Sequence, residues 1–500
     1  MSSSAEAHRI ARSLFNAARA KYDAHDLDGA AEDCRQVLVI TPESAGAFHL
    51  LGLVHHAQGR HGEGADLIER AMTRNPRVAD YAIDLARVRA AQERWVESAA
   101  AASIATSLEP QSAIAHCCLG IALMWQGRAA QAEECIRKAI ARDGDSAPAW
   151  SALGQVLYHQ GRDGEAESAW RRAIEKNPAY ADAHFHLAAS RLAVDDFAEG
   201  WPEFEWRAQA DLAGFNAPAL SAPRWRGQAL GGKSILVWSE QGLGEQILFA
   251  RLIPDLAAQG AQIILACERR LVPLFARSFE GVRVVAREAP IANLQADFQI
   301  PMGSLAQYFR KDAAEFPRHK GYLRIDPGLA VELRARYRRL AGTTRLVGIV
   351  WHSTRRRGGA FKSTDLAADW GPVLQQPGVT FFSLQHGPIF NAVGRAHITH
   401  GTIIHHDPAI DPAKDADGWA VQISAMDTVI SVSSTAAHLA GALNVPCRVL
   451  TPAGGGRLWY WGAGRTHIPR PTPGLPPGTP LGTPVCAFTL SPSPATGPKP

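Results

Sequence analysis

A period of 34 residues runs through the first two hundred residues of the chain and limits what this region can fold into. Prolines at the ends of successive helical segments mark the period: Pro42, Pro76, Pro110 and Pro178. The eighth position of each unit is always glycine or alanine: Ala18, Gly52, Ala86, Gly120, Gly154 and Ala188. Small residues let two helices approach closely, and proline cannot continue a helix. The period therefore predicts stacked helix–turn–helix units.

This spacing is that of tetratricopeptide repeats. It predicts five full units from Ala11 to Tyr180 and a sixth, capping unit that begins at Ala181. The sixth unit carries three large apolar residues: Leu187, Phe204 and Trp206. We assign residues 1–207 to this helical solenoid. Such an array offers a concave surface to an extended peptide or another protein, or, alternatively, only stiffens the chain or drives self-association.

Charge, cysteine content and hydropathy exclude several classes of protein. The chain has 52 basic and 48 acidic residues, a net charge of +4, which argues against a dedicated nucleic-acid-binding protein. The seven cysteines are scattered and form no C-x-x-C pair, so we expect a reducing compartment rather than disulfides. No stretch approaches the roughly 20 apolar residues of a membrane span. We therefore expect a soluble, cytoplasmic protein without a transmembrane segment.

Beyond an irregular linker at residues 208–232, strands and helices alternate. The predicted strands are Lys233–Ser239, Gln262–Ala266, Val282–Val285, Arg345–Trp351, Val379–Leu384, Thr428–Val432 and one that begins at Val449. Their arrangement predicts two doubly wound α/β halves, residues 233–328 and 329–468, with a ligand between the carboxyl edges of the two sheets. From residue 469 onward 11 of 32 residues are proline, which predicts a disordered tail over residues 469–500.

The stretch from Asp427 to Leu450 carries the strongest signal for a site. A buried strand over Thr428–Val432 is followed by a helix of small residues over Ala436–Leu443. Three hydroxyl residues suited to capping that helix stand between them: Ser433, Ser434 and Thr435. Free N–H groups at a helix N-terminus suit a phosphate, and His438 lies one turn into the helix. An ordinary capped helix would give the same pattern.

A glycine turn follows the first predicted strand of the α/β region. It reads Gly242-Leu-Gly244-Glu245 and opens into a helix. Glycines at this place let another group approach the backbone, although a dinucleotide fingerprint needs a third glycine. Glu245 is placed to act as a general base in the cleft. The alternative is an acid that simply suits a helix N-terminus.

Two further loops are predicted to line the cleft. Residues 352–364 combine hydroxyls, three arginines and Lys362, with Thr354 near the start of the loop. This composition suits a diphosphate clamp or, alternatively, a solvated basic loop. Residues 383–387 include Gln385, and the backbone there could hold the edge of a base, although a plain loop fits equally well.

Histidines and aspartates gather between His397 and Asp417. No H-E-x-x-H spacing and no complete calcium loop occurs among them, so we predict no metal site. Asp417 is expected to cap a helix over Gly418–Met426.

Taken in order, these motifs resemble a known family. Residues from about Trp225 to Trp461 look like the glycosyltransferase domain that follows tetratricopeptide repeats in bacterial proteins. That domain is similar to the ADP-heptose:lipopolysaccharide heptosyltransferases, which have the GT-B fold, and more remotely to the peptide O-GlcNAc transferases. The matching segments are Trp238–Glu245, Gly348–Trp351, Ser383–Gln385 and Ile430–Leu443. With the repeats, the resemblance covers most of the chain.

The resemblance implies inverting transfer of a sugar from a nucleotide-diphosphate donor, with no obligatory metal and no further cofactor. Glu245 stands where the family has the aspartate that serves as base. Lys362 matches the basic residue that neutralises the leaving diphosphate. Together with the loops above, the expected donor-binding set is Gly244, Thr354, Lys362, Gln385, Ser433, Ser434, Thr435 and His438.

Besides Glu245 in place of the aspartate, the chain departs from the family in two further places. The family's D-T-x-x-x-H run maps onto residues 433–438, with Ser433 in place of the aspartate. A helix that closes the fold back onto its first half is not evident after Trp461. Two hypotheses follow. One is a glycosyltransferase whose repeats recruit a protein or glycan acceptor, and the other is a non-catalytic repeat scaffold with a degenerate transferase domain.

Overall fold

The computed structural model describes residues 2–210, 215, 217–316, 321–353, 362–452, 458–461 and 485–488. The chain divides into two compact units, residues 1–180 and residues 181–500. The division falls before the boundary at residue 207 that the repeat pattern predicts. The sixth helix pair therefore groups with the α/β region and not with the first five.

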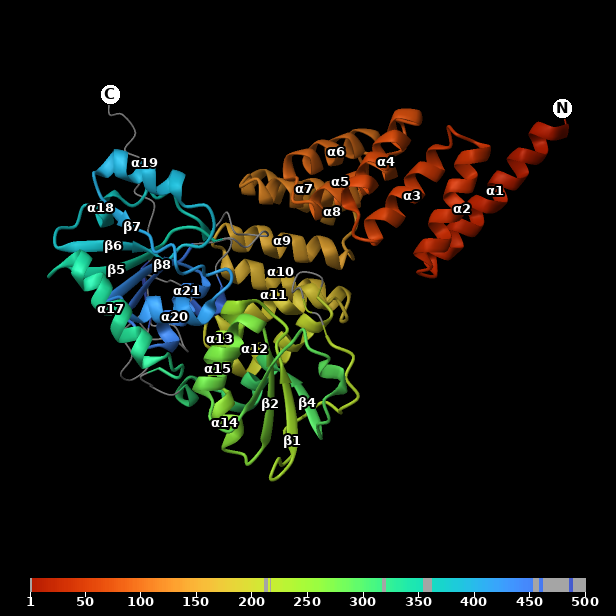
Figure 1. The fold of residues 1–500 in the computed structure, drawn as a ribbon. Coiled ribbons are helices and arrows are strands. Elements are labelled where there is room, and N and C mark those ends of the chain that lie inside the picture. The colour runs from red at the N-terminus through yellow and green to blue at the C-terminus, as the bar shows by residue number, and fades with distance from the viewer. Residues whose placement is uncertain are drawn as a thin grey trace. The chain divides into compact units, whose positions relative to one another are not determined.

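Residues 2–180 form five helix pairs (Figure 1). The helices are α1 (Ser2–Asp23), α2 (Leu27–Ile40), α3 (Ala45–Ala57), α4 (His61–Arg74), α5 (Ala79–Ala91), α6 (Trp95–Leu108), α7 (Ala113–Trp125), α8 (Ala129–Arg142), α9 (Ala147–His159) and α10 (Asp163–Lys176). The pairs that begin with α3, α5, α7 and α9 start 34 residues apart, at Ala45, Ala79, Ala113 and Ala147. The predicted period and the helix–turn–helix units are confirmed.

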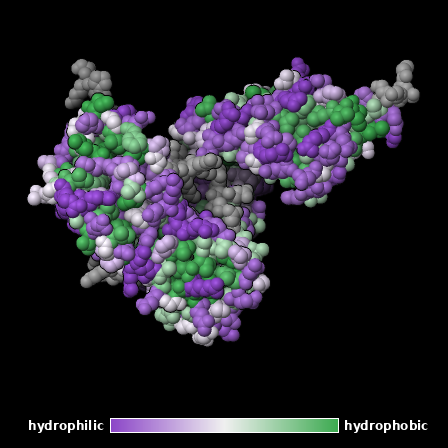
Figure 2. Space-filling view, viewed as in Figure 1, coloured by the Kyte–Doolittle hydropathy of each residue, from purple (hydrophilic) through white to green (hydrophobic). Residues whose placement is uncertain are grey.

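The small positions of the repeat bring the two helices of a pair into close contact. A Cβ atom on Gly52 in α3 would lie 2.8 Å from the carbonyl oxygen of Gly64 in α4, closer than a side chain tolerates. Ala71 and Ala139, at equivalent places in two second helices, are fully buried. Outside this core, the face in Figure 2 shows a largely hydrophilic surface with separate hydrophobic patches.

The second unit begins with the sixth helix pair, α11 (Ala181–Leu192) and α12 (Phe197–Phe204), and the 3-10 turn η1 (Glu205–Ala208). Phe204 and Trp201 are buried in the same core as the first α/β half. Trp201 Nε1 donates a hydrogen bond of 2.6 Å to the carbonyl oxygen of Arg310 in that half. The pair is therefore an integral part of the α/β unit.

The first half contains a four-stranded parallel sheet in the order β3-β2-β1-β4. The strands are β1 (Ser234–Trp238), β2 (Gln262–Cys267), β3 (Arg283–Ala286) and β4 (Phe298–Pro301). The helices are α13 (Leu243–Ala250), α14 (Ile253–Ala257), α15 (Val272–Ser278) and α16 (Ala306–Phe309), with 3-10 turns η2 (Arg269–Leu271), η3 (Ile291–Asn293), η4 (Met302–Leu305) and η5 (Ala313–Glu315). Three strands match predicted ones, and β4 was not predicted. Part of the predicted linker runs along β4, where Trp225 N donates to Gln299 O at 2.9 Å.

The second half contains a parallel sheet in the order β10-β9-β8-β5-β6-β7. The strands are β5 (Arg345–Val350), β6 (Val379–Ser383), β7 (Ile404–His405), β8 (Thr428–Val432), β9 (Cys447–Leu450) and β10 (Val485–Phe488). The helices are α17 (Pro327–Ala341), α18 (Gly371–Leu374), α19 (Phe390–His400), α20 (Ala416–Ser424) and α21 (Thr435–Ala442). Strand β10 corrects the prediction of disorder for four residues of the tail, because they extend the sheet beside β9. The rest of that tail lies outside the described residues.

Alternate residues of β5 face two different cores. Leu346 and Val350 pack with residues of α17, α20 and α21, whereas Val347 and Ile349 pack with residues of α18 and α19. Helices thus cover both faces of the sheet, as Figure 1 shows. This is the doubly wound arrangement expected from the alternating pattern, and it leaves the carboxyl ends of the strands as the place where ligands bind.

A short 3-10 turn, η7 (Trp459–Trp461), brings the chain back to the first half. The ring of Trp459 lies 5.2 Å from that of Trp201 in α12 and 6.5 Å from that of Phe249 in α13. This turn therefore packs against both the sixth helix pair and the first half. Among the described residues, the structure has no helix with the length and hydropathy needed to cross a bilayer.

Candidate functional site

Two turns, one from each α/β half, meet at the carboxyl ends of their strands. The first leads from β1 into α13, and the second leads from β8 into α21. A Cβ atom on Gly244 would lie 2.8 Å from Cδ2 of His438, so the imidazole ring touches the backbone of the glycine turn. The structure therefore brings together two of the predicted site residues that are far apart in sequence.

The glycine turn is held in place by Gln246, whose side chain is almost fully buried. Its Nε2 donates to the carbonyl oxygen of Gln241 at 3.0 Å, and its Oε1 accepts from the backbone N–H of Glu268 at 2.9 Å. One amide thus fastens the turn to the end of β2. No local pattern in the sequence points to Gln246, because its partner at position 268 becomes its neighbour only in the fold.

Glu245 is half-buried in the first turn of α13. Its Oε2 lies 3.0 Å from where a Cβ on Gly242 would stand, so the carboxylate folds back over the start of its own helix. That position suits the positive end of the helix dipole. It also leaves the carboxylate beside the turn that meets α21, so both interpretations of Glu245 fit its position.

The hydroxyls before α21 are arranged differently from the capping prediction. Ser434 occupies the N-cap position, but its side chain accepts no hydrogen bond from the helix. Its Oγ instead shares a hydrogen bond of 2.8 Å with Oγ of Ser431, and Ser433 is almost fully buried. Thr435 begins the helix and is half-buried. The first turn of α21 consequently lacks a side-chain cap from Ser434.

His438 is 2% exposed and packs edge-on against Tyr460 with ring centroids 4.9 Å apart. Burial, and to a lesser extent the charge of Lys362, lower the pKa of His438 to about 3. The imidazole is therefore neutral at physiological pH. A neutral imidazole can donate one hydrogen bond and accept another, but it adds no charge to a phosphate site.

Lys362 is only 6% exposed, and its charge acts on the buried imidazole of His438. The predicted basic loop thus contributes a cation close to α21. Thr354, the three arginines at positions 355–357 and the remainder of the loop up to position 361 lie outside the described residues.

Gln385 is buried and uses its side chain to join two strand ends. Its Oε1 accepts from the backbone N–H groups of Trp351 at 3.2 Å and His352 at 3.0 Å, and its Nε2 donates to His386 O at 3.1 Å. These bonds brace the ends of β5 and β6, and the loop that follows β5 starts from this braced point.

The acids near the end of the predicted histidine cluster have structural partners. Asp415, and not Asp417, is the N-cap of α20, and its Oδ1 accepts from Gly418 N at 2.8 Å. Asp417 instead forms two hydrogen bonds, of 2.7 and 2.9 Å, with Arg277 of α15. The capping prediction for Asp417 is therefore wrong, because a partner in the other half engages its carboxylate. Within the described ranges, no group of three or more His, Cys, Asp or Glu is arranged to hold a metal ion.

A buried ionic network behind the glycine turn was missed by the sequence analysis. Arg207 of η1 lies 2.9 Å from Glu240, which stands two residues after the end of β1, and donates to Ser304 at 2.8 Å. The same guanidinium group packs over the ring of Phe204 at 4.4 Å. Only the fold brings these groups together, because they come from three separate segments.

Comparison with known proteins gives partial matches. Protein FlbA of Caulobacter vibrioides is 34% identical over 287 residues, which cover 54% of this chain and 48% of FlbA. The chain thus spans about half the length of this curated relative. Of the solved structures, TTC0263, a thermophilic TPR protein of Thermus thermophilus, is 20% identical over 36% of this chain and 99% of its own, with a TM-score of 0.33.

Two other solved structures cover similar shares of the chain. The pilF protein of Pseudomonas aeruginosa is 15% identical, covers 41% of this chain and 91% of its own, and has a TM-score of 0.35. YrrB, described as a TPR protein with an unusual peptide-binding site, is 19% identical over 34% of this chain and 88% of its own, with a TM-score of 0.30.

A family model described as tetratricopeptide repeat matches residues 15–79, 49–113 and 117–170. These ranges fall within the five helix pairs that the structure places between residues 2 and 180. The N-terminal region of the chain is therefore built of tetratricopeptide repeats.

Proposed function

We propose that the α/β region transfers a sugar from a nucleotide-diphosphate donor to an acceptor hydroxyl. The observation that carries this proposal is the meeting of the β1–α13 and β8–α21 turns at Gly244 and His438. Ligands of parallel α/β sheets bind at the carboxyl ends of strands. A ligand between two such edges can contact residues of both halves. A protein acceptor would be recruited by the repeats, which is the usual role of such arrays.

The diphosphate of the donor would lie at the N-terminus of α21. Backbone N–H groups at a helix N-terminus and the helix dipole favour an anion. The cap residue Ser434 does not occupy those N–H groups with its side chain, and Lys362 supplies a positive charge nearby. In this arrangement His438 orients the helix start and the glycine turn against each other.

In the chemical step, Glu245 would take the proton of the acceptor hydroxyl as the acceptor oxygen attacks the anomeric carbon. The bond between that carbon and the phosphate oxygen breaks, and the nucleoside diphosphate leaves with the bonding electrons. Lys362 and the first turn of α21 would stabilise the charge that develops on the leaving group. The carboxylate of Glu245 lies beside Gly242, on the turn that contacts α21, which is compatible with this role.

A non-catalytic scaffold is the second candidate, and two contacts favour it. The ring of His438 lies against Gly244 with no room for an added carbon atom, and the hydroxyl of Ser434 is taken up by Ser431. In this case the α/β region would be a degenerate transferase domain that supports the repeats, and only the repeats would bind a partner.

Release of nucleoside diphosphate from a panel of sugar donors tests the enzymatic proposal. The wild-type chain is expected to release the diphosphate from one donor class, and Glu245→Gln should slow the release at least about 100-fold. Glu280→Gln, at an exposed position of the same half, serves as the control and should leave the rate unchanged. No release from any donor would leave the scaffold as the better account, and equal rates in wild type and Glu245→Gln would exclude Glu245 as the general base.

A further inference from the structure

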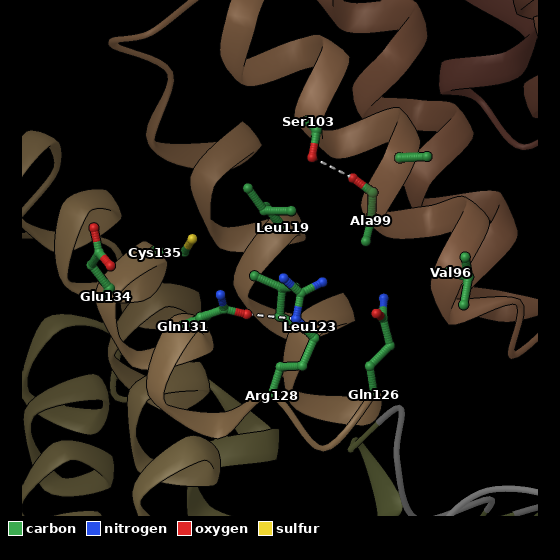
Figure 3. A pocket seen from close by; sticks show the side chains of 11 residues that line it. Val96, Ala99, Ser103, Leu119, Leu123, Gln126, Arg128, Gln131, Glu134 and Cys135 are labelled. Atoms are coloured by element: carbon green, nitrogen blue, oxygen red, sulfur yellow. Dashed lines mark hydrogen bonds between the residues drawn. The ribbon is translucent and has the colours of Figure 1, made fainter.

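A groove of about 450 Å³ lies between the second helices of two successive repeats, α6 and α8, with α7 as its floor (Figure 3). Small and apolar side chains line most of it, and an arginine lies at one end. The lining residues on which the argument rests are Ala100, Ser103, Leu123, Arg128, Gln131 and Glu134. All of them belong to residues 2–180, so the groove is complete within the repeat unit.

The repeat itself supplies a reference for the outer face of α6. At the positions of Ala100, Ser103 and Ile104, the second helices of the neighbouring repeats carry charged residues: Asp66, Glu69 and Arg70 in α4, and Glu134, Arg137 and Lys138 in α8. In α6 these charges are absent, while Val96 is 69% exposed and Ile104 is 45% exposed. A helix that is apolar on its outer as well as its inner face is normally covered. The outer face of α6 is therefore unusual among the repeats.

Arg128 differs from its counterparts in the other repeats in the same way. An arginine at this position is paired with a glutamate three residues later in the three other repeats that carry it: Arg60 with Glu63, Arg94 with Glu97, and Arg162 with Glu165. The residue three positions after Arg128 is Gln131, whose Oε1 accepts from Nε of Arg128 at 2.5 Å. The amide is neutral, so it satisfies a donor without compensating the charge. Glu134, also on the groove, is engaged by Lys138 at 2.6 Å.

We propose that this groove binds an amphipathic segment of another protein that carries large apolar side chains next to a carboxylate. The space over Ala100, Ser103 and Leu123 accepts the apolar side chains, which gain free energy by leaving water. Arg128 at the end of the groove binds the carboxylate through charge-assisted hydrogen bonds. An amphipathic helix lying in an apolar groove is a common mode of peptide recognition.

A second copy of the chain is a poorer occupant, because the same face on both copies would set one hollow against another. Two such faces would also bring the two Arg128 side chains to the interface, while the carboxylate on the groove, that of Glu134, is already paired with Lys138. The inferred site does not depend on sugar transfer, since it lies wholly on the repeats.

Fluorescence anisotropy with the full chain tests the proposal. The probe is a fluorescein-labelled synthetic helical peptide with leucines along one face and glutamates in its last turn. Its charge-swapped form, with lysines in place of the glutamates, is the comparison. The acidic peptide is expected to bind at least about tenfold more tightly than the lysine peptide, a ratio that a single charge-assisted contact can supply.

Two variants locate the binding on the groove. Ala100→Glu combined with Ser103→Arg gives α6 the outer residues of α8, and Gln131→Glu restores the glutamate that the other repeats have. Each variant is expected to lower the affinity for the acidic peptide about tenfold, with a helix content by circular dichroism equal to that of the wild type. Glu165→Gln, the matched position one repeat later, should leave the affinity unchanged.

Equal affinity for the two peptides, or no loss of affinity in Gln131→Glu, would overturn the proposal. Sedimentation of the wild-type chain and the Ala100→Glu/Ser103→Arg variant tests the other occupant. A wild-type dimer that dissociates in this variant would assign the groove to a second copy and would likewise overturn it.

Discussion

Arg207 and Glu240 form an ion pair in the interior of the α/β unit, with 2.9 Å between Nη2 and Oε1 and side chains that are 1% and 2% exposed. Glu240 also accepts from the backbone N–H of Gly303 at 3.0 Å. The pair links the turn after the sixth helix pair to the end of β1, directly before the glycine turn. Loss of this ion pair would therefore affect the position of the glycine turn as well as the packing of the core.

Arg207→Met should lower the free energy of unfolding by about 3–5 kcal/mol, because it leaves the carboxylate of Glu240 buried without its cation. Urea unfolding followed by tryptophan fluorescence measures the change. Arg226→Gln removes an arginine from an exposed position nearby and serves as the control, with an expected change below about 0.5 kcal/mol. A cost for Arg207→Met no larger than that of the control would contradict the buried pair.

Gly244→Ala should destabilise the α/β unit by about 1–3 kcal/mol, because the added carbon would meet the ring of His438 at 2.8 Å. Gly242→Ala is the matched comparison, since its Cβ would meet only the flexible end of Glu245 at 3.0 Å. Chemical denaturation of both variants gives the difference. A Gly244→Ala variant as stable as Gly242→Ala would contradict the close contact between Gly244 and the ring of His438.

Local patterns in the sequence were enough to predict much of this fold. The helix pairs were predictable because the same pattern of small residues and prolines recurs in successive repeats. Strand β8 has the bounds predicted from its β-branched residues. Strand β4 was missed because it is short and ends in Pro301, and β7 because it has two residues. Such strands exist through their pairing with neighbours, which a local pattern does not contain.

The candidate site was predictable in position but not in its contacts. The turns at Gly244 and before His438 were correctly expected at strand ends. The direction of the Ser434 hydroxyl, toward Ser431, and the use of the Gln385 side chain between two strands depend on tertiary packing. The same holds for Asp417, whose partner lies 140 residues away in sequence.

The stability of the α/β unit should fall as the pH is lowered through the acidic range, in part because of His438. Its pKa in the folded protein is about 3, below its ordinary value of 6.5, because of burial and the nearby charge of Lys362. Between these values the unfolded chain binds a proton that the folded chain does not. The stabilisation is therefore complete above about pH 6.5 and is lost toward pH 3, by up to about 1.4 kcal/mol per pH unit.

Unfolding free energies of wild type and His438→Gln, measured at several values of pH, separate this contribution from that of the acids. The variant should show a shallower loss of stability between pH 6.5 and 4 than the wild type. Parallel curves for the two proteins would mean that His438 titrates normally in the folded state.

Asp415 and Asp417 both contribute to the free energy of unfolding, and salt should affect the two contributions differently. Asp415→Ala removes the N-cap of α20 and should cost about 1 kcal/mol with little dependence on salt. Asp417→Ala breaks the bidentate pair between Asp417, whose side chain is 19% exposed, and Arg277, whose side chain is 33% exposed. The cost of this substitution should shrink as salt is added, because salt screens partly exposed charges. Unfolding in low and high sodium chloride distinguishes the two. A cost that depends on salt for Asp415→Ala and does not for Asp417→Ala would indicate that Asp417 is the cap.

The first turn of α21 and Lys362 are proposed to form a site for a nucleoside diphosphate. Isothermal titration calorimetry of the full chain with UDP, GDP, ADP, CDP and dTDP tests it most directly. We expect one nucleotide to bind with micromolar affinity, and Lys362→Ala to weaken that binding at least about tenfold. Lys414→Ala, at an exposed lysine of the same half, should leave it unchanged. Absence of binding to all five nucleotides by a folded chain, or equal affinity in Lys362→Ala, would contradict the claim.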